Sequence, residues 1–568
     1  MVPLRLYRAA ALLIVCGVVI AALSISDRPA PLPLPPAGEG VSAEAVLNEL
    51  LTLRASFPAP RPGSRADREL ARYLAGQLAA YGFRTQVRTL VGNTVGGEKR
   101  LADVIATKAA ANGGAPLVIV AHRDTDGGGG SLAATAVLLA VARYLGQVQT
   151  GRPLVLASTS GGSGGYAGAR ALVRLLSANG LTAAQAPAAA SQEGELAAPP
   201  VAHRPADAVL VIADPLAGPL LENQAQFGPA LARTAAAALD QNGLPVRAVP
   251  SLPEAFGALA LARQPREAQP FAAAGIPAAT FGSAGEGGFQ LQPQRLAQVA
   301  DALLATVQAL NSARPPSLEP QALAVGEKLL AGWALRLLGG ACLLAGWLIG
   351  AGLLLTAARR RQPVLRESLR GLALALPAFL AAAALAIGGA AGVGALAAPP
   401  AGGGIDLGAG GWLLVCGSGL ILVGGLALAL LRGRGGRAEA KIGAATLLVV
   451  FAATVLWAFQ PAASLALCPT ALILPLATRP SRRGQRLGLV ALGLCFPALL
   501  WSLSAASWPT GLLTLPALFA TAAVPPLAAL CWAVVFGAGV LALSAALPAT
   551  AQPAGGGAIA REVVASGR

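Results

Sequence analysis

The side chains best suited to chemistry follow three apolar runs of the sequence. The residues concerned are His122, Asp124 and Asp126 after LVIVA (117–121), Ser160 and Ser163 after PLVLAST (153–159), and Asp214 after 208–213. His122, Asp124 or Asp126, and Asp214 have the donor types that would hold a single zinc ion. No neighbouring residue is an evident general base. The serines lie outside a Gly-x-Ser-x-Gly elbow, and we interpret them as loop residues that could line a binding cleft together with Asp126. The simpler alternative is a structural hydrogen bond between His122 and Asp124.

Strands and helices must bring these residues together, and the hydrophobic periodicity of the chain predicts them. It predicts strands at 84–91, 101–107, 116–121, 153–158, 208–213 and 274–281, and helices at 61–83, 131–145, from about Gly165, 228–242 and 293–311. This alternation predicts an α/β domain with a mostly parallel central sheet and helices on both faces. Because sites in such sheets form at the carboxyl ends of strands, we expect the residues above to lie at one edge.

Apolar residues and charge are distributed unevenly. The chain is 55% hydrophobic with a mean hydropathy of +0.63, which is too apolar for an ordinary soluble protein. Residues 28–328 carry 24 basic and 21 acidic side chains, whereas the part beyond them carries 16 basic and 4 acidic. The net charge of +16 therefore comes mainly from the apolar half. It is not the basic footprint of a nucleic-acid-binding domain.

Long apolar runs predict a polytopic helical membrane domain. They lie near 9–25, 333–356, 371–397, 411–431, 442–459, 462–478, 487–507 and 524–547, and basic residues cluster in alternate loops between them. The positive-inside rule then places both termini in the cytoplasm and the large domain outside. All six cysteines fall in predicted spans, so no disulfide framework is expected.

The predicted domain organisation has five parts. Residues 1–27 are a signal anchor, with a cleaved signal peptide as the alternative; 28–44 are a Pro-rich linker; and 45–314 are the exported domain, with a low-complexity insertion at 184–206. Residues 329–547 form about seven membrane helices, and 548–568 a cytoplasmic tail. The protein is therefore expected to be a multi-pass protein of the plasma membrane with an extracytoplasmic domain.

Six segments of the exported domain resemble, in order, the di-zinc aminopeptidase family that includes leucyl aminopeptidases, glutamate carboxypeptidase and glutaminyl cyclases. They are RPGS (61–64), AHRD (121–124), 127–143, GGSGGYAGARAL (161–172), IADPLAG (212–218) and PFAAAGIPA (270–278). The resemblance implies that His122 and Asp214 match metal ligands and Asp124 matches the residue that orients the first ligand. It also implies that the bridging Asp is replaced by Gly130, the general base by Gly162 and a Glu ligand by Ser163. No histidine follows the strand at 274–281.

The resemblance therefore implies a fold that has lost most of its zinc ligands and its catalytic base. The membrane layout is similar to that of the peptidase-like subunit of the GPI-anchor transamidase, which holds substrate for a separate catalytic subunit. We expect a catalytically inactive scaffold or substrate-binding subunit without a cofactor. Its expected partners are the bilayer, another envelope or membrane protein, and a peptide or lipid-linked substrate. A zinc metallopeptidase or amidohydrolase with a remodelled single-metal site, and a transporter with an exported capture domain, remain alternatives.

Overall fold

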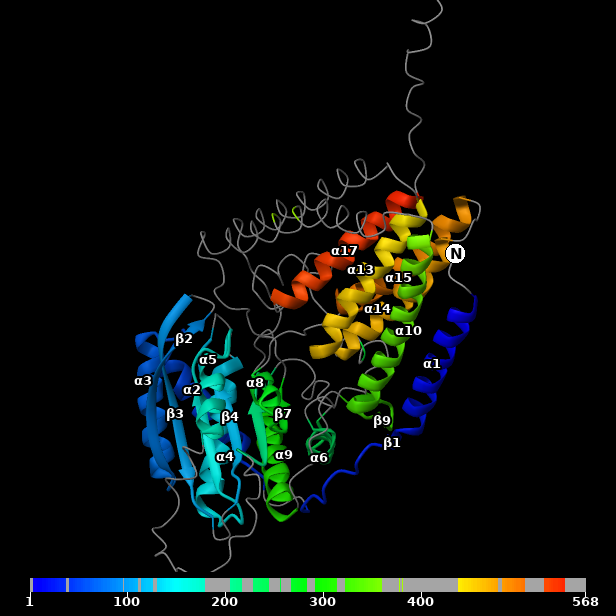
Figure 1. The fold of residues 1–568 in the computed structure, drawn as a ribbon. Coiled ribbons are helices and arrows are strands. Elements are labelled where there is room, and N and C mark those ends of the chain that lie inside the picture. The colour runs from blue at the N-terminus through cyan, green and yellow to red at the C-terminus, as the bar shows by residue number, and fades with distance from the viewer. Residues whose placement is uncertain are drawn as a thin grey trace, which may run out of the picture.

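The computed structural model describes residues 4–36, 40–94, 97–110, 114–125, 130–178, 205–216, 228–244, 256, 267–282, 292–313, 322–359, 377, 381, 438–478, 483–505 and 526–546. Its soluble part is built on a six-stranded sheet in the order β2-β3-β5-β4-β6-β7 (Figure 1). The strands are β2 (Arg84–Thr94), β3 (Gly97–Lys108), β4 (Leu117–His122), β5 (Leu154–Thr159), β6 (Ala208–Ile212) and β7 (Ala278–Phe281). The sheet contains all six of the strands expected from the sequence.

The sheet is mixed: three of its five strand pairings are parallel, and the expected parallel pairing fails only at the β2–β3–β5 edge. β5, β4, β6 and β7 run parallel to one another, but β2 pairs antiparallel with β3, and β3 with β5. Only residues 95 and 96 separate β2 from β3, and a parallel connection needs about a dozen residues or more. The short link therefore forces a hairpin. β4 and β5 lie in the middle of the sheet, where their continuous apolar runs are buried on both faces.

Helices cover both faces of this sheet. They are α2 (Ala43–Ser56), α3 (Arg65–Ala80), α4 (Gly130–Gln147), α5 (Ala167–Ser177), α6 (Pro229–Gln241), α8 (Gln269–Ala273) and α9 (Pro293–Ser312). One core cluster joins α2, α3, α4, α6 and α9 to one face, and a second joins α5 and α8 to the other. The helices predicted at 131–145, 228–242 and 293–311 are confirmed within two residues. The last strand is shorter than predicted, because α8 ends at Ala273 and Gly275 turns the chain at φ +76°.

The Pro-rich segment after α1 (Leu4–Leu23) lies along the soluble domain. Leu32 N donates to Thr234 Oγ1 of α6 at 3.0 Å, and Gln241 Nε2 donates to Pro35 O at 3.1 Å. Val41 N then donates to Asp301 Oδ1 of α9 at 2.7 Å. This segment is thus bound to two helices of the domain rather than free of it.

Four of the described helices are long and apolar enough to cross a membrane: Arg5–Leu23, Gly332–Thr356, Ala438–Phe459 and Pro461–Thr478. They belong to α1, α10 (Gly332–Arg359), α13 (Ala438–Phe459), and α14 (Pro461–Ile473) with its 3₁₀ continuation. Helices α15 (Arg483–Ala505) and α17 (Pro526–Ala546) occupy two further predicted spans. The spans predicted at 371–397 and 411–431, residues 184–204 of the insertion, and the tail at 548–568 lie outside the described residues, apart from Pro377 and Ala381.

A small second sheet joins the C-terminal end of α1 to the N-terminal end of α10, and we call these two helix ends the feet of α1 and α10. β1 (Ile25–Asp27) pairs antiparallel with β9 (Lys328–Leu330), which pairs with β8 (Leu323–Val325). Lys328 Nζ lies 2.5 Å from Asp27 Oδ1 across the first pair. The two chain segments that enter and leave the soluble domain are therefore tied to each other beside the apolar helices (Figure 1).

Candidate functional site

Two buried polar clusters lie at the carboxyl ends of β4 and β5. The Arg123 cluster consists of Arg123, Asp67, Ser160 and Asp103, and the His122 cluster of His122, Glu267 and Thr159. Two adjacent residues, the last of β4 and the one after it, thus belong to different networks. The edge predicted to carry chemistry is polar, as expected for the carboxyl ends of parallel strands.

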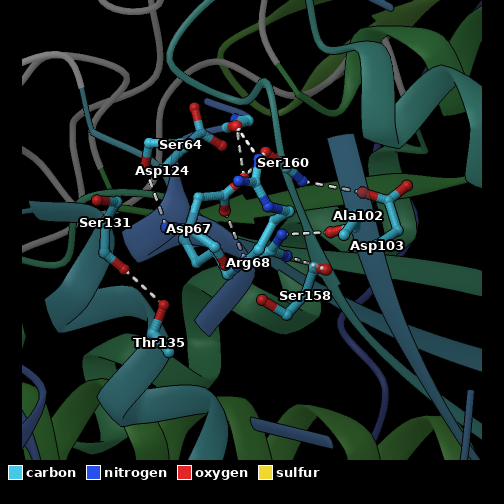
Figure 2. Close-up of polar contacts among 12 residues, drawn as sticks. Ser64, Asp67, Arg68, Ala102, Asp103, Asp124, Ser131, Thr135, Ser158 and Ser160 are labelled. Carbon is cyan, nitrogen blue, oxygen red and sulfur yellow. Dashed lines mark hydrogen bonds and ion pairs between the residues drawn. The ribbon is translucent and has the colours of Figure 1, made fainter. Parts of the chain in front are cut away.

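The Arg123 cluster is closed to solvent. Figure 2 shows Asp67, Asp103 and Ser160 of this cluster beside Ala102 and Ser158. The side chains of Arg123 and Asp67 are fully buried, with Nε 2.8 Å from Asp67 Oδ1. The guanidinium also donates to Ser158 O at 2.9 Å and to Ala102 O. Asp67 Oδ2 accepts the Ser160 hydroxyl at 2.8 Å. A buried charge is tolerated only when it is paired and hydrogen-bonded. The bonds that satisfy Arg123 come from α3, β3 and β5, so they hold these elements together around the end of β4.

Asp103 on β3 completes this cluster. Its Oδ1 accepts the backbone N–H of Ser160 at 2.9 Å. Burial raises the pKa of Asp103 to about 7, although the hydrogen bond from Ser160 and the charge of Arg123 act in the opposite direction. Burial also raises the pKa of Asp67, and Arg123 opposes that rise. The network therefore contains carboxyl groups whose charged form is disfavoured by the loss of water.

The His122 cluster lies nearer the surface. His122 Nδ1 is 2.9 Å from Glu267 Oε2, and the other carboxylate oxygen accepts the Thr159 hydroxyl at 2.5 Å. The side chain of His122 is 14% exposed and that of Glu267 is 4% exposed. A carboxylate at Nδ1 fixes the tautomer and orientation of an imidazole and presents Nε2 as the outer ring nitrogen. This pair could orient a metal ligand or a proton carrier.

Asp124 binds the loop after β5 instead of pointing to an open site. Its Oδ1 accepts Gly162 N at 3.0 Å, and its Oδ2 accepts Ser163 N at 3.0 Å and Ser163 Oγ at 2.7 Å. Asp124 is fully buried. Three donors thus satisfy both carboxylate oxygens. The carboxylate at His122 Nδ1 is Glu267, whereas the sequence suggested Asp124 as the partner of the ring.

Gly162 has no room for a side chain. A Cβ atom placed on it would lie 2.1 Å from His122 Cβ and 2.3 Å from His122 Cγ. Carbon atoms in contact normally stay about 3.5–4.0 Å apart. The imidazole therefore occupies the space into which any side chain at position 162 would project.

The remaining candidates lie apart from this contact or outside the described residues. Asp214 follows β6, is 5% exposed, and its Oδ1 accepts Leu216 N at 2.9 Å. Asp126 lies outside the described residues. Within the part of the chain that the structure describes, no three His, Cys, Asp or Glu side chains form a group that could hold a metal ion. The structure brings His122 close to Gly162 and Asp124 close to Ser163. Among the described residues it places Asp214 in no group that could hold a metal ion.

Sequence reasoning missed the partners that define both clusters. Glu267 lies 145 residues from His122 along the chain and Asp67 lies 56 residues from Arg123, so neither pair has a local spacing signal. Asp67 has one local signal: it stands three residues after Ser64, whose hydroxyl accepts Asp67 N at 3.1 Å. That spacing marks the start of a helix but not its buried ion pair.

Comparison with known proteins gives matches among solved structures only, because no family model and no curated protein matches the chain. A glutaminyl cyclase of an Acidobacteriales bacterium is 16% identical, with a TM-score of 0.37, over 50% of this chain and 98% of its own. A glutaminyl cyclase of Porphyromonas gingivalis is 19% identical, with a TM-score of 0.35, over 48% and 99%. A leucine aminopeptidase precursor of Bacteroides thetaiotaomicron is 13% identical, with a TM-score of 0.34, over 49% and 98%. The structural neighbours of about half of this chain are therefore glutaminyl cyclases and aminopeptidase-like proteins.

Proposed function

We propose that the protein is a catalytically inactive, peptidase-like membrane protein that acts as a scaffold or substrate-binding subunit of an envelope complex. The observation that carries this proposal is the contact between Gly162 and the ring of His122. The family resemblance assigns the general base to position 162. A carboxylate side chain could enter there only if His122 moved away, so hydrolysis by the usual route has neither the residue nor the space for it.

The hydrogen bonds of the site support the same proposal. Both oxygens of Asp124 are taken up by Gly162 and Ser163, the two positions at which the resemblance assigns the lost base and the lost Glu ligand. A carboxylate that already accepts three hydrogen bonds is poorly disposed to bind a metal as well. In this proposal the former catalytic loops hold each other in place, and the surface above them serves for binding.

The apolar helices support a membrane role. Four described helices are long enough to span a bilayer, and the sheet of β1, β9 and β8 ties the soluble domain to the feet of α1 and α10. With the alternating basic loops of the sequence, we propose a multi-pass protein whose soluble domain is extracytoplasmic and whose termini are cytoplasmic. A partner envelope protein, or a peptide or lipid-linked substrate, would meet that domain at the membrane surface.

The second candidate is a hydrolase with a remodelled single-metal site. One observation favours it: the Glu267 carboxylate at Nδ1 is the arrangement that commonly orients a metal-binding histidine. Zinc would then need His122, either Asp124 or Asp126, and Asp214 as ligands, together with a bound water to act as nucleophile. Asp124 would first have to release the loop at 162–163.

Hydrolysis by the purified full-length protein in detergent tests the proposal. The chain has two histidines, His122 and His203, so His203→Ala is the control for His122→Ala. All three proteins are loaded with zinc and compared on aminoacyl-naphthylamides, N-terminal glutaminyl peptides and simple amides. We expect all three proteins to give the same background rate. Chelator-sensitive hydrolysis that disappears with His122→Ala and survives His203→Ala would overturn the proposal and favour the remodelled metal site.

A further inference from the structure

Exposed basic residues gather at one end of the soluble domain. We call this surface the basic hairpin end. All six of its residues are exposed: Arg61, Arg65, Arg68, Arg72, Lys99 and Arg100. None of them takes part in either cluster of the candidate site, so the functions discussed so far leave this surface unexplained.

The fold brings these residues together from two segments. Arg65, Arg68 and Arg72 follow one another at helical spacing on the outer face of α3. The turn before α3 lies against the start of β3: a Cβ on Gly63 would be 2.8 Å from Arg100 O and 3.2 Å from Lys99 Cβ. The helix and the hairpin of β2 and β3 therefore form one continuous surface.

The positive charge of this surface is only partly compensated. Within residues 61–72 and 97–100 the acidic residues are Asp67, Glu69 and Glu98. Asp67 is buried against Arg123, and Glu69 pairs with Arg65 at 2.7 Å. Since residues 28–328 carry almost equal numbers of basic and acidic residues, this end of the domain is a local concentration of positive charge. Such a surface attracts a partner that carries several negative charges.

Exposed apolar side chains adjoin the arginines. Val91 lies directly opposite Arg100 in the β2–β3 ladder and is 58% exposed, and Val87, four residues earlier on the same face, is 43% exposed. Basic side chains next to a few exposed apolar ones suit the boundary between anionic headgroups and acyl chains.

We propose that the basic hairpin end rests on anionic phospholipid headgroups of the bilayer that the chain's own helices span. This inference rests on the membrane assignment of the proposed function. Two observations favour lipid over an acidic protein. The small sheet of β1, β9 and β8 holds the domain beside the feet of α1 and α10. Figure 1 also shows the β2–β3 hairpin at the end of the domain that lies toward α17, where a membrane surface could meet it.

Contact between the basic hairpin end and the bilayer would fix how the domain is oriented on the membrane. A domain fixed to the membrane at the foot of α1 and α10, and again at the basic hairpin end, would have a set orientation. The polar edge formed by β4 and β5 adjoins the same surface, because Thr125 N donates to Pro60 O at 3.0 Å beside Arg61. A phosphate-bearing, lipid-linked substrate would therefore reach the candidate site along a positively charged surface.

Spin-label accessibility of the full-length protein in nanodiscs tests the inference. Asn93→Cys, at an exposed position near the end of β2, carries a nitroxide, and the unsubstituted chain gives the background from the native cysteines. Discs contain either phosphatidylcholine alone or phosphatidylcholine with phosphatidylglycerol at 70:30. On the anionic discs we expect about a twofold or larger loss of accessibility to a water-soluble relaxant, which 0.5 M salt reverses.

Two charge variants sharpen the experiment. Arg65→Gln with Lys99→Gln removes two of the six basic side chains of the basic hairpin end and should weaken the effect of phosphatidylglycerol. Arg84→Gln with Arg143→Gln removes two exposed charges elsewhere on the domain and should leave it intact. Equal accessibility on both discs, or a salt-insensitive effect in all variants, would overturn the inference. A chain that does not co-elute with the discs would instead contradict the membrane assignment.

Discussion

The Arg123 cluster and the His122 cluster contain adjacent residues at the end of β4 but differ in their exposure. The Arg123 cluster is fully buried, and its guanidinium bonds a carboxylate and backbone carbonyls from three elements. The His122 cluster lies nearer the surface, and its imidazole is 14% exposed. The comparison assigns the first cluster to stability and the second to the surface that a ligand can reach. In the inactive protein that we propose, the Arg123 cluster would hold the strand ends together without a catalytic site beside it.

Removal of the buried Arg123 guanidinium should cause the largest loss of stability. Arg123→Ala leaves the Asp67 carboxylate and several carbonyls buried without their partner, so we expect a loss of about 3–5 kcal/mol in the free energy of unfolding, or no folded protein. Expression level and the thermal unfolding temperature in detergent measure this loss. Arg65→Ala, whose side chain is 86% exposed, is the matched control and should change stability by less than about 0.5 kcal/mol. A stable Arg123→Ala protein would show that the Arg123 cluster does not stabilise the fold, contrary to the comparison above.

A methyl group at position 162 should have the next largest effect. Gly162→Ala places Cβ 2.1 Å from His122 Cβ, and we expect a cost of about 2–3 kcal/mol from the overpacked contact. In the His122→Gly background the same substitution should cost much less, since the clashing atoms are gone. Gly76→Ala is the control, because a Cβ there meets nothing within 4 Å. Equal costs in both backgrounds would show that His122 does not fill the space at position 162.

The pH dependence of stability separates the clusters further. The folded protein holds the Asp103 proton up to about pH 7, whereas the unfolded chain releases it near pH 4. Between these values the folded state binds more protons, so the contribution of Asp103 to stability falls as pH rises. We expect Asp103→Asn to remove about 2 kcal/mol of that fall between pH 5 and 7. Thermal unfolding across this range measures it, and an unchanged slope in the variant would contradict the buried ionisation.

The sequence predicted the elements of the soluble domain better than their side-chain partners. Apolar runs and helical spacing are local, so β4, β5, α4, α6 and α9 could be located within a few residues. The antiparallel hairpin of β2 and β3 was also within reach, because the strands expected at 84–91 and 101–107 leave only residues 92–100 between them, too few for a parallel connection. We expected mostly parallel pairing, and at that edge of the sheet the β2–β3 and β3–β5 pairings are antiparallel instead.

Partners in the clusters could not be derived from local patterns. AHRD at 121–124 contains His122, Arg123 and Asp124 in succession, yet each is held by a different segment of the chain. Which carboxylate meets which residue depends on how α3, α8 and the loop after β5 pack around the strand ends. The space filled by His122 against Gly162 is likewise a property of the folded backbone.

The zinc content of the purified full-length protein tests the central claim most directly. After zinc loading and dialysis, the metal per chain is measured for the protein, His122→Ala and His203→Ala. If the Gly162–His122 contact and the hydrogen bonds of Asp124 close the site, all three proteins should contain the same sub-stoichiometric zinc. About one zinc per chain that is lost only with His122→Ala would contradict this account, since His122 would then be a metal ligand.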